Sequence, residues 1–248
     1  ENRLSNMLFV ALFLLAIAVS TEAQSCGCRA QSSPAQGYQL LNDKTNFQGD
    51  IVLNNQQKLY VGGFRNTNPS RLWTGRTVYY TVSQGSQQSV ANALNGITRA
   101  TGGCLKFVYG RGRGNYVDVF QGGGCYSAVG MSGGRQRLSL GNGCWSTGTI
   151  QHEFLHAAGF WHEQSRRDRS NHILIHWSKI LSNMCYNFNY FGTVPRQAYD
   201  TKSIMHYESW SFACRRGDKT ITDKQGRDVG GRSLTALDVQ KIRALYRC

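Results

Sequence analysis

The most informative stretch of this 248-residue chain is TIQHEFLHAAGFWHE, residues 149–163. Its apolar and polar residues predict a helix over Gly148–Ala158. His152 and His156 are four residues apart, so on a helix both imidazoles project from one face, one turn apart. That geometry suits two nitrogen ligands converging on one metal ion.

The turn after this helix predicts a third ligand. Gly159 can take a positive φ at low cost, which ends the helix and turns the chain back so that His162 supplies another nitrogen. Three nitrogens suit one tetrahedral zinc ion per chain, and the open fourth position is typical of a catalytic site. Glu153 lies beside His152, so we expect it to act as a general base on zinc-activated water. The alternative is an amphipathic helix carrying surface histidines.

The same run resembles a known family. H-E-x-x-H-x-x-G-x-x-H is the metzincin signature, and its continuation FWHEQ, residues 160–164, resembles the astacin family of secreted zinc endopeptidases. SIMHY, residues 203–207, resembles that family's Met-turn. The resemblance implies that Met205 forms an apolar floor beneath the metal. It also implies that Tyr207 is a labile fifth zinc ligand that swings out to hydrogen-bond the transition state.

The resemblance covers about residues 71–248 and implies an α+β fold. The expected domain is a two-lobed metzincin (zincin-like) domain, with a twisted, mostly antiparallel sheet, an active-site helix, a C-terminal helix and an irregular lower lobe. An extended substrate would pair with the edge strand of the sheet. Residues 122–134 are rich in glycine but are not followed by the G-K-[ST] of a phosphate-binding loop. We therefore expect their backbone to approach a neighbouring backbone closely at a sheet edge. Residue patterns predict strands over Thr77–Val82, Leu105–Tyr109, Val117–Phe120 and Leu138–Leu140, and helices over Ser89–Ala100 and from Leu237 to Leu245.

Residues 1–23 resemble a secretory signal peptide. The apolar run from Leu8 to Val19 is too short to span a bilayer comfortably, and cleavage after Ala23 fits the small-residue rule. An uncleaved anchor is the alternative. We therefore expect residues 24–65 to be a propeptide and residues 66–248 to be the catalytic domain of a secreted, extracellular protein, with no membrane attachment after signal cleavage.

The expected propeptide contains FQGD, residues 47–50, which resembles the F-x-G-D motif of the family's propeptides. The resemblance implies that Asp50 occupies the open zinc position in the zymogen and displaces water. A thiolate from Cys26 or Cys28 is the rival switch. It is less favoured because thiols in an oxidising compartment tend to form disulfides.

An activating protease is an expected partner. Arg65–Asn66 suits a trypsin-like activator, whereas Gly63–Phe64 better matches the family's spacing, and the sequence does not choose between them. The resemblance also implies that Glu163 pairs with the mature N-terminus inside the lower lobe, since a buried carboxylate without a partner is costly.

Eight cysteines favour an oxidising destination. A structural zinc bound by cysteines is disfavoured, because the six cysteines of the main body contain no C-x-x-C pair. Their spacing alone leaves the pairing open. The resemblance implies Cys104–Cys248 and Cys125–Cys144, which leaves Cys185–Cys214 as a third bridge and no assigned role for Cys26 and Cys28.

The composition limits the classes of partner that this protein is expected to bind. The formal net charge is +14, which favours acidic partners and solubility about equally. Nucleic-acid binding is disfavoured, because the basic residues are scattered and no recognition motif accompanies them. The two hypotheses are an active endopeptidase acting on proteins or peptides and a binding or matrix protein that keeps its zinc without turnover. The filled catalytic positions favour the enzyme, but nothing selects a digestive, hatching, venom or matrix role, a cleavage specificity or an oligomeric state.

Overall fold

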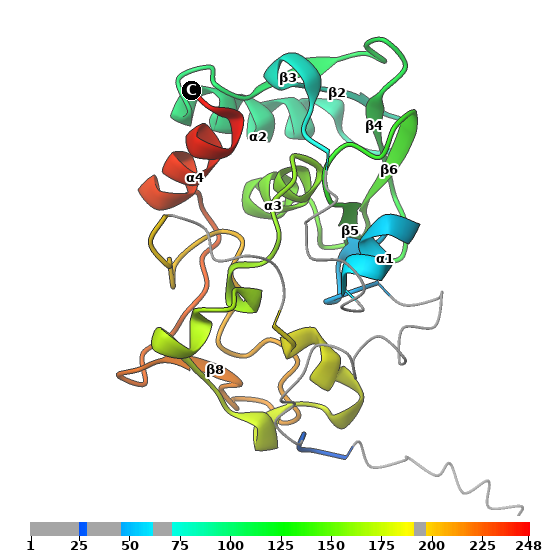
Figure 1. Ribbon diagram of the computed structural model, residues 1–248. Coiled ribbons are helices and arrows are strands. Elements are labelled where there is room, and N and C mark those ends of the chain that lie inside the picture. Colours follow the sequence, from blue (N-terminus) through cyan, green and yellow to red (C-terminus); the bar gives the residue numbers. More distant parts are fainter. Residues whose placement is uncertain (1–24, 29–45, 62–70, 191–196) are drawn as a thin grey trace, which may run out of the picture.

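The computed structural model describes residues 25–28, 46–61, 71–190 and 197–248. Two lobes are visible in Figure 1. The upper lobe contains a sheet and α-helices, and the lower lobe is built mainly from loops and short 3-10 helices. Each lobe has its own cluster of buried apolar side chains. The predicted two-lobed α+β architecture is confirmed.

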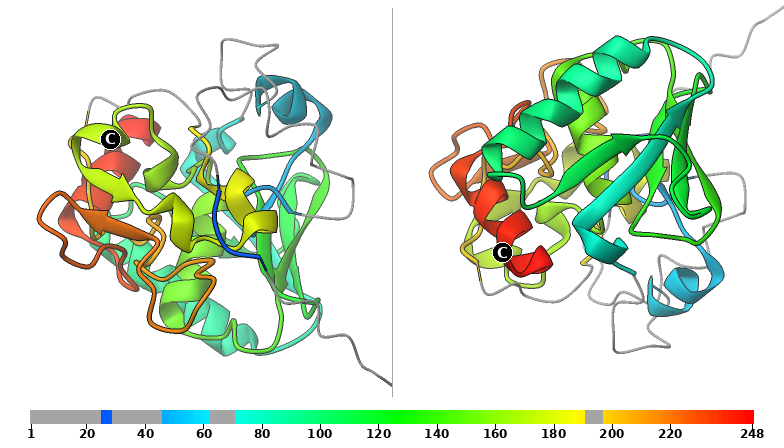
Figure 2. Two further views of the ribbon diagram at one scale, coloured as in Figure 1. Left: turned by 90° about the horizontal axis from the view of Figure 1, so that it is seen from below. Right: turned by 90° about the horizontal axis from the view of Figure 1, so that it is seen from above.

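The upper lobe is organised around a six-stranded sheet with the order β1-β5-β6-β4-β2-β3. Helices α2 and α3 cover one face of this sheet, and α4 lies beside them at the C-terminus (Figure 2). Helix α1 lies in the N-terminal segment. The elements are β1 Ile51–Val52, α1 Asn55–Val61, β2 Thr77–Val82, α2 Gln87–Ala100, β3 Lys106–Tyr109, β4 Tyr116–Phe120, β5 Cys125–Ala128, β6 Arg135–Leu140, α3 Thr147–Ala157 and α4 Ala236–Tyr246, with a 3-10 turn at Thr74–Arg76.

The expectation of a mostly antiparallel sheet is wrong. Strand β2 runs parallel to β3 and β4, β4 runs parallel to β6, and β1 runs parallel to β5. The single antiparallel pairing within this sheet, among the described residues, joins β5 to β6. Helix α2 fills the connection from β2 to β3, and a helical crossover returns the chain to the same end of the sheet, so the two strands become parallel.

The glycine-rich stretch was expected to approach other backbone closely at a sheet edge, but its strand lies one place inside that edge. It contains β5, which pairs with β6 on one side and with β1 on the other. Just beyond β6, a Cβ added at Gly141 would lie 2.5 Å from the carbonyl oxygen of Gly122 and 2.7 Å from the nitrogen of Gly124. Only a residue without a side chain permits this approach.

The lower lobe contains little regular structure. A two-stranded antiparallel sheet pairs β7 with β8, and its core contains Ile180, Phe188 and Ile221. The elements are β7 Ile173–Ile175, β8 Ile221–Asp223 and the 3-10 helices Glu163–Ser165, Arg169–Asn171, Trp177–Lys179 and Ser182–Phe188.

Four disulfides cross-link the described chain. Two are the bridges that the resemblance implies, Cys104–Cys248 and Cys125–Cys144. The expected Cys185–Cys214 bridge is wrong, because Cys26 pairs with Cys214 and Cys28 pairs with Cys185. The N-terminal cysteines lie too far away in sequence for spacing to reveal this pairing, which the folded lower lobe brings about.

The predicted signal peptide and both predicted activation sites lie outside the described residues. Within the described part of the chain, no helix is long and apolar enough to cross a membrane.

Candidate metal centre

Helix α3 positions two of the predicted ligands. It spans Thr147–Ala157, one residue earlier at each end than the sequence predicts, and the Ser146 side chain caps it by accepting a hydrogen bond from the Thr149 amide. Gly159 follows the helix with φ +108°, in the conformation predicted for it. Its turn directs the chain back toward the two histidines of the helix.

Four side chains converge at this point. One donor atom each from Asp50, His152, His156 and His162 lies within 4.8 Å of the others. The Asp50 carboxylate stands among the Nε2 atoms, at 3.2 Å from His152, 3.1 Å from His162 and 3.8 Å from His156. All three predicted histidines and the predicted pro-segment carboxylate are therefore brought together.

The other ring nitrogen of each histidine contacts an oxygen. Carbonyl and amide oxygens accept hydrogen bonds but cannot donate them, so each Nδ1 carries the proton and donates it. A neutral imidazole protonated at Nδ1 directs its Nε2 lone pair into the centre, as a metal ligand must. The contacts are His152 with Ile204 O at 2.8 Å, His156 with Phe160 O at 2.7 Å, and His162 with Gln48 Oε1 at 2.9 Å.

A zinc ion fits this donor set. The Nε2 atom of His156 is buried and has no hydrogen-bond partner among the described residues, and neither has Asp50 Oδ1. Leaving such atoms unpartnered is costly. Burial lowers the pKa of His156 to about 4, so the ring is neutral near pH 7. Three neutral imidazoles and one carboxylate are a typical zinc donor set.

Glu153 lies at the wall of the cleft. It is buried next to His152, and its Oε2 atom has no partner among the described residues. Burial raises the pKa of its carboxyl well above the usual range, and the charge of Asp50 adds to this. Glu153, Thr149 and Tyr207 contribute to the lining of a cavity of about 680 Å³. A carboxyl of raised pKa at such a wall is suited to carrying a proton.

Gln48 connects the N-terminal segment to two residues of the centre. Its backbone carbonyl accepts a hydrogen bond from the Tyr207 hydroxyl, and its side-chain oxygen contacts His162. The next residue also fits closely: a Cβ at Gly49, where φ is +82°, would lie 2.9 Å from the ring of Phe212. The sequence FQGD therefore supplies contacts from Gln48 and Gly49 as well as from Asp50.

Strand β1 continues the contacts of the N-terminal segment onto the sheet. Ile51 pairs with Ser127 and Val52 pairs with Ala128, both on β5. The amide of Ser127 also donates to the Asp50 carbonyl at 2.8 Å. The N-terminal segment thus covers the strand edge that would otherwise face the cleft.

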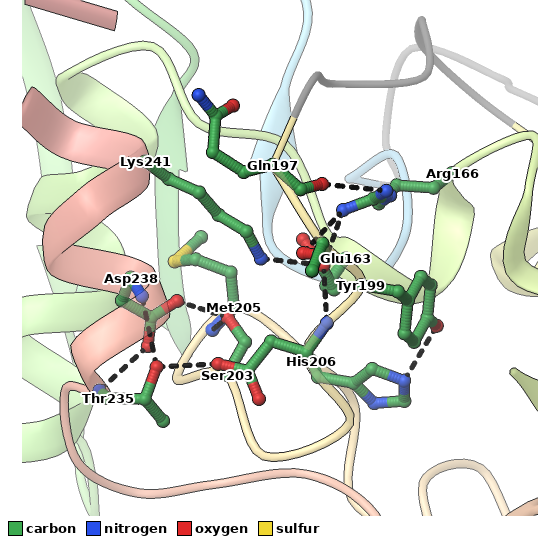
Figure 3. A network of polar contacts seen from close by, with 12 residues as sticks. Glu163, Arg166, Gln197, Tyr199, Ser203, Met205, His206, Thr235, Asp238 and Lys241 are labelled. Atoms are coloured by element: carbon green, nitrogen blue, oxygen red, sulfur yellow. Dashed lines mark hydrogen bonds and ion pairs between the residues drawn. The ribbon is translucent and has the colours of Figure 1, made fainter. Parts of the chain in front are cut away.

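Helix α4 anchors the predicted Met-turn. Met205 is buried in the upper core. The carboxylate of Asp238 accepts hydrogen bonds from Ser203 Oγ at 2.5 Å and from the Ile204 amide at 3.0 Å (Figure 3). Asp238 also completes a capping box with Thr235 at the start of α4. The C-terminal helix therefore fixes the turn whose Ile204 carbonyl contacts His152.

Glu163 is the centre of a buried ionic network. Its Oε1 atom accepts from Arg166 Nη1 at 2.9 Å, from the Asp200 amide at 2.9 Å and from Lys241 Nζ at 2.6 Å (Figure 3). The resemblance implies a mature N-terminus as its partner, and that end of the chain falls outside the described residues. In this form, two side-chain cations neutralise Glu163.

Three residues that support the site were not predicted from the sequence. Asp238 had a visible signal, because T-x-x-D before an apolar run is a capping pattern. Gln48 lies inside the quoted propeptide motif, but its partners His162 and Tyr207 are far away in sequence. Lys241 carries no local signal, since nothing in its helix indicates a carboxylate on another element.

This chain is similar to several known proteins. Residues 65–247 match the model of the peptidase family described as Astacin. The chain is 38% identical over 219 residues to zinc metalloproteinase nas-6 of Caenorhabditis elegans, covering 82% of this chain and 63% of that protein. It is 34% identical over 246 residues to zinc metalloproteinase nas-4 of the same organism, covering 92% of this chain and 75% of that one.

A solved structure shows the same architecture. High choriolytic enzyme 1, a hatching enzyme zinc-protease from Oryzias latipes, superposes with a TM-score of 0.65 at 35% sequence identity. The match covers 72% of this chain and 94% of that one. This chain therefore belongs to the astacin family of peptidases, and the ion for which its three histidines are arranged is zinc.

Proposed function

We propose that this chain is a secreted, zinc-dependent endopeptidase that hydrolyses peptide bonds of protein substrates and is held latent by its own N-terminal segment. Residues 1–23 are the proposed signal peptide, residues 24–65 the propeptide and residues 66–248 the catalytic domain. The family membership and the zinc-binding histidines support the activity, and the disulfides support an oxidising, extracellular destination.

The single observation that carries the proposal is the position of Asp50. Its carboxylate lies 3.1–3.2 Å from the Nε2 atoms of His152 and His162. A charged carboxylate at the position of the catalytic water excludes that water, so Asp50 acts as an intramolecular inhibitor.

The catalytic roles follow from what each side chain can reach. Zinc bound at the three Nε2 atoms would polarise a peptide carbonyl and lower the pKa of a water molecule toward 7. Glu153 takes the proton from the attacking water and delivers it to the leaving nitrogen. The carbonyls of Ile204 and Phe160 keep their histidines oriented by accepting from Nδ1.

Tyr207 is the proposed transition-state donor and labile ligand. Its hydroxyl is bound to the Gln48 carbonyl, so it becomes available only when the N-terminal segment leaves. Freed from that bond, it can donate to the carbonyl oxygen that gains negative charge. Departure of β1 also exposes the β5 edge, along which an extended peptide can pair backbone to backbone.

Metal removal tests the activity. We expect the processed chain to clear casein in a zymogram, to lose that clearing in EDTA and to regain it with added Zn²⁺, because three histidines without their ion cannot activate water. The uncleaved chain, with Asp50 in place, is the control and should clear weakly. A fully processed protein without chelator-sensitive cleavage would overturn the proposed function.

Replacing the carboxylate tests latency. We expect Asp50→Ala to raise the activity of the uncleaved chain by about tenfold or more, since losing only ~1.4 kcal/mol of segment binding changes the open fraction tenfold. Asp50→Asn, which keeps an oxygen but no charge, should give an intermediate rise. The measurement is peptide hydrolysis before and after activation.

Val52→Ala is the matched control for this series. Val52 lies on the same strand but is 40% exposed, and its side chain takes no part in the histidine centre. It should stay as latent as the wild type. Unchanged latency in Asp50→Ala would exclude Asp50 as the switch.

A further inference from the structure

The extreme N-terminal part of the described chain, residues 25–28, is anchored to the lower lobe. Cys26 bonds to Cys214, and Cys28 bonds to Cys185. Backbone hydrogen bonds reinforce these bridges: the Gly27 amide donates to Ile180 O at 2.9 Å, the Cys28 amide donates to Trp177 O at 2.9 Å, and the Ser182 amide donates to Ser25 O at 3.1 Å. This short segment therefore forms part of the lower lobe itself.

The anchor and the inhibitory contact meet on one lower-lobe loop. Cys214 lies two residues after Phe212, whose ring packs against Tyr207 at a centroid distance of 5.5 Å and faces Gly49. Cys28 and Phe212 both pack against the apolar cluster that contains Tyr207. Residues 25–28 and Gly49 thus contact neighbouring parts of the same lower-lobe cluster, of which Phe212 and Tyr207 also line the cavity.

The activating cut falls C-terminal to both sets of contacts in the sequence. The match to the family model begins at residue 65, after both the anchor and Asp50. A cut anywhere between Val61 and Arg71 hydrolyses one peptide bond and produces one new carboxylate and one new ammonium group. It leaves both sulfur–sulfur bonds intact.

We propose that the pro-segment stays covalently attached to the catalytic domain after activation, with Cys185 and Cys214 as its permanent attachment sites. The mature protein is then a two-chain, disulfide-linked enzyme. The attachment itself does not depend on catalysis. Its regulatory consequence rests on the proposed function, because it requires Asp50 to be an inhibitor.

That consequence is an inhibitor that cannot diffuse away. A tethered competitor acts at an effective concentration set by its tether, on the order of millimolar for short tethers. Asp50 and Gln48 can therefore return to the cleft after the cut, and substrate must compete with them within the same molecule. Dilution weakens a dissociating inhibitor but leaves this one unchanged.

The test uses the full chain with a recognition sequence for a site-specific protease inserted between residues 66 and 71. After complete cleavage, we expect intact-mass analysis and non-reducing gels to show one species, which separates into pro-fragment and catalytic chain only with reductant. Cys104–Cys248 and Cys125–Cys144 lie within the catalytic chain, so their reduction releases nothing. Separation without reductant would overturn the proposal, whatever the protein's activity.

Bridge variants provide the matched controls. The pairs Cys26→Ser/Cys214→Ser and Cys28→Ser/Cys185→Ser each keep one bridge and should still retain the pro-fragment. The fourfold variant should release it. After cleavage, the wild type's activity per molecule should stay constant within about twofold on dilution, whereas that of the fourfold variant should rise. An equal rise in both proteins would exclude intramolecular inhibition.

Discussion

Glu153→Gln is expected to abolish nearly all peptide hydrolysis by the processed chain while zinc stays bound. Glutamine keeps the shape of the side chain, and Glu153 is not among the four groups that converge on the metal position. The amide cannot take a proton from water, so we expect kcat to fall by about 10²–10⁴-fold, the usual contribution of a general base. Peptide hydrolysis and zinc content should be measured on the same sample.

Asp228→Asn is the matched control for this prediction. It makes the same carboxylate-to-amide change in an exposed residue whose partner is Lys219, away from the cavity. Its kcat and zinc content should match those of the wild type. A Glu153→Gln enzyme that loses less than about tenfold in kcat with full zinc occupancy would rule out the assigned role.

Glu163→Gln is expected to cause a large loss of stability. The Glu163 and Lys241 side chains are only 7% and 8% exposed, and Arg166 is 5% exposed. Glutamine can still accept from the Asp200 amide, but it cannot neutralise two buried cations. Removing one partner from such a network costs about 3–5 kcal/mol, chiefly because a buried charge is left uncompensated. Guanidinium unfolding followed by fluorescence measures this loss.

Two further variants distinguish the cost of an uncompensated buried charge from the cost of an ordinary Glu→Gln substitution. Among the described residues, Glu163 is the one hydrogen-bonding partner of the Lys241 ammonium, whereas Arg166 also pairs with Asp168. The double variant Glu163→Gln/Lys241→Met should therefore recover part of the loss. Glu208→Gln breaks an ion pair with Arg232, whose side chain is 81% exposed, and should cost less than about 1 kcal/mol. Equal losses in Glu163→Gln and Glu208→Gln would contradict this account.

The histidine centre could be derived from the sequence because its determinants are local. A spacing of four residues on a helix and a glycine turn three residues later bring His152, His156 and His162 together without reference to the rest of the chain. Strand β2 matches its predicted bounds for the same reason, and α2 begins two residues before the predicted helix. Periodicity within a segment reports which face is buried, whatever that face packs against.

Contacts between segments that are distant in sequence could not be derived in this way. The parallel direction of β2, β3, β4 and β6, the pairing of Cys26 and Cys28, and the contacts of Gln48 each depend on segments distant in sequence. Resemblance to the family carried some of this information, including Asp50 at the zinc position and two of the four disulfides. It carried none for residues 25–28, where the chain's own lower lobe selects the partners.

Residue identity and spacing thus specified a zinc site, its family and the three histidines that form it. Only the folded chain specified which lobe holds the N-terminal cysteines, which cations neutralise Glu163 and which strands run side by side. The physical reason is that local patterns report burial and backbone conformation, whereas partners across the molecule are selected by the packing of the whole core, and that selection leaves no periodic trace in either segment.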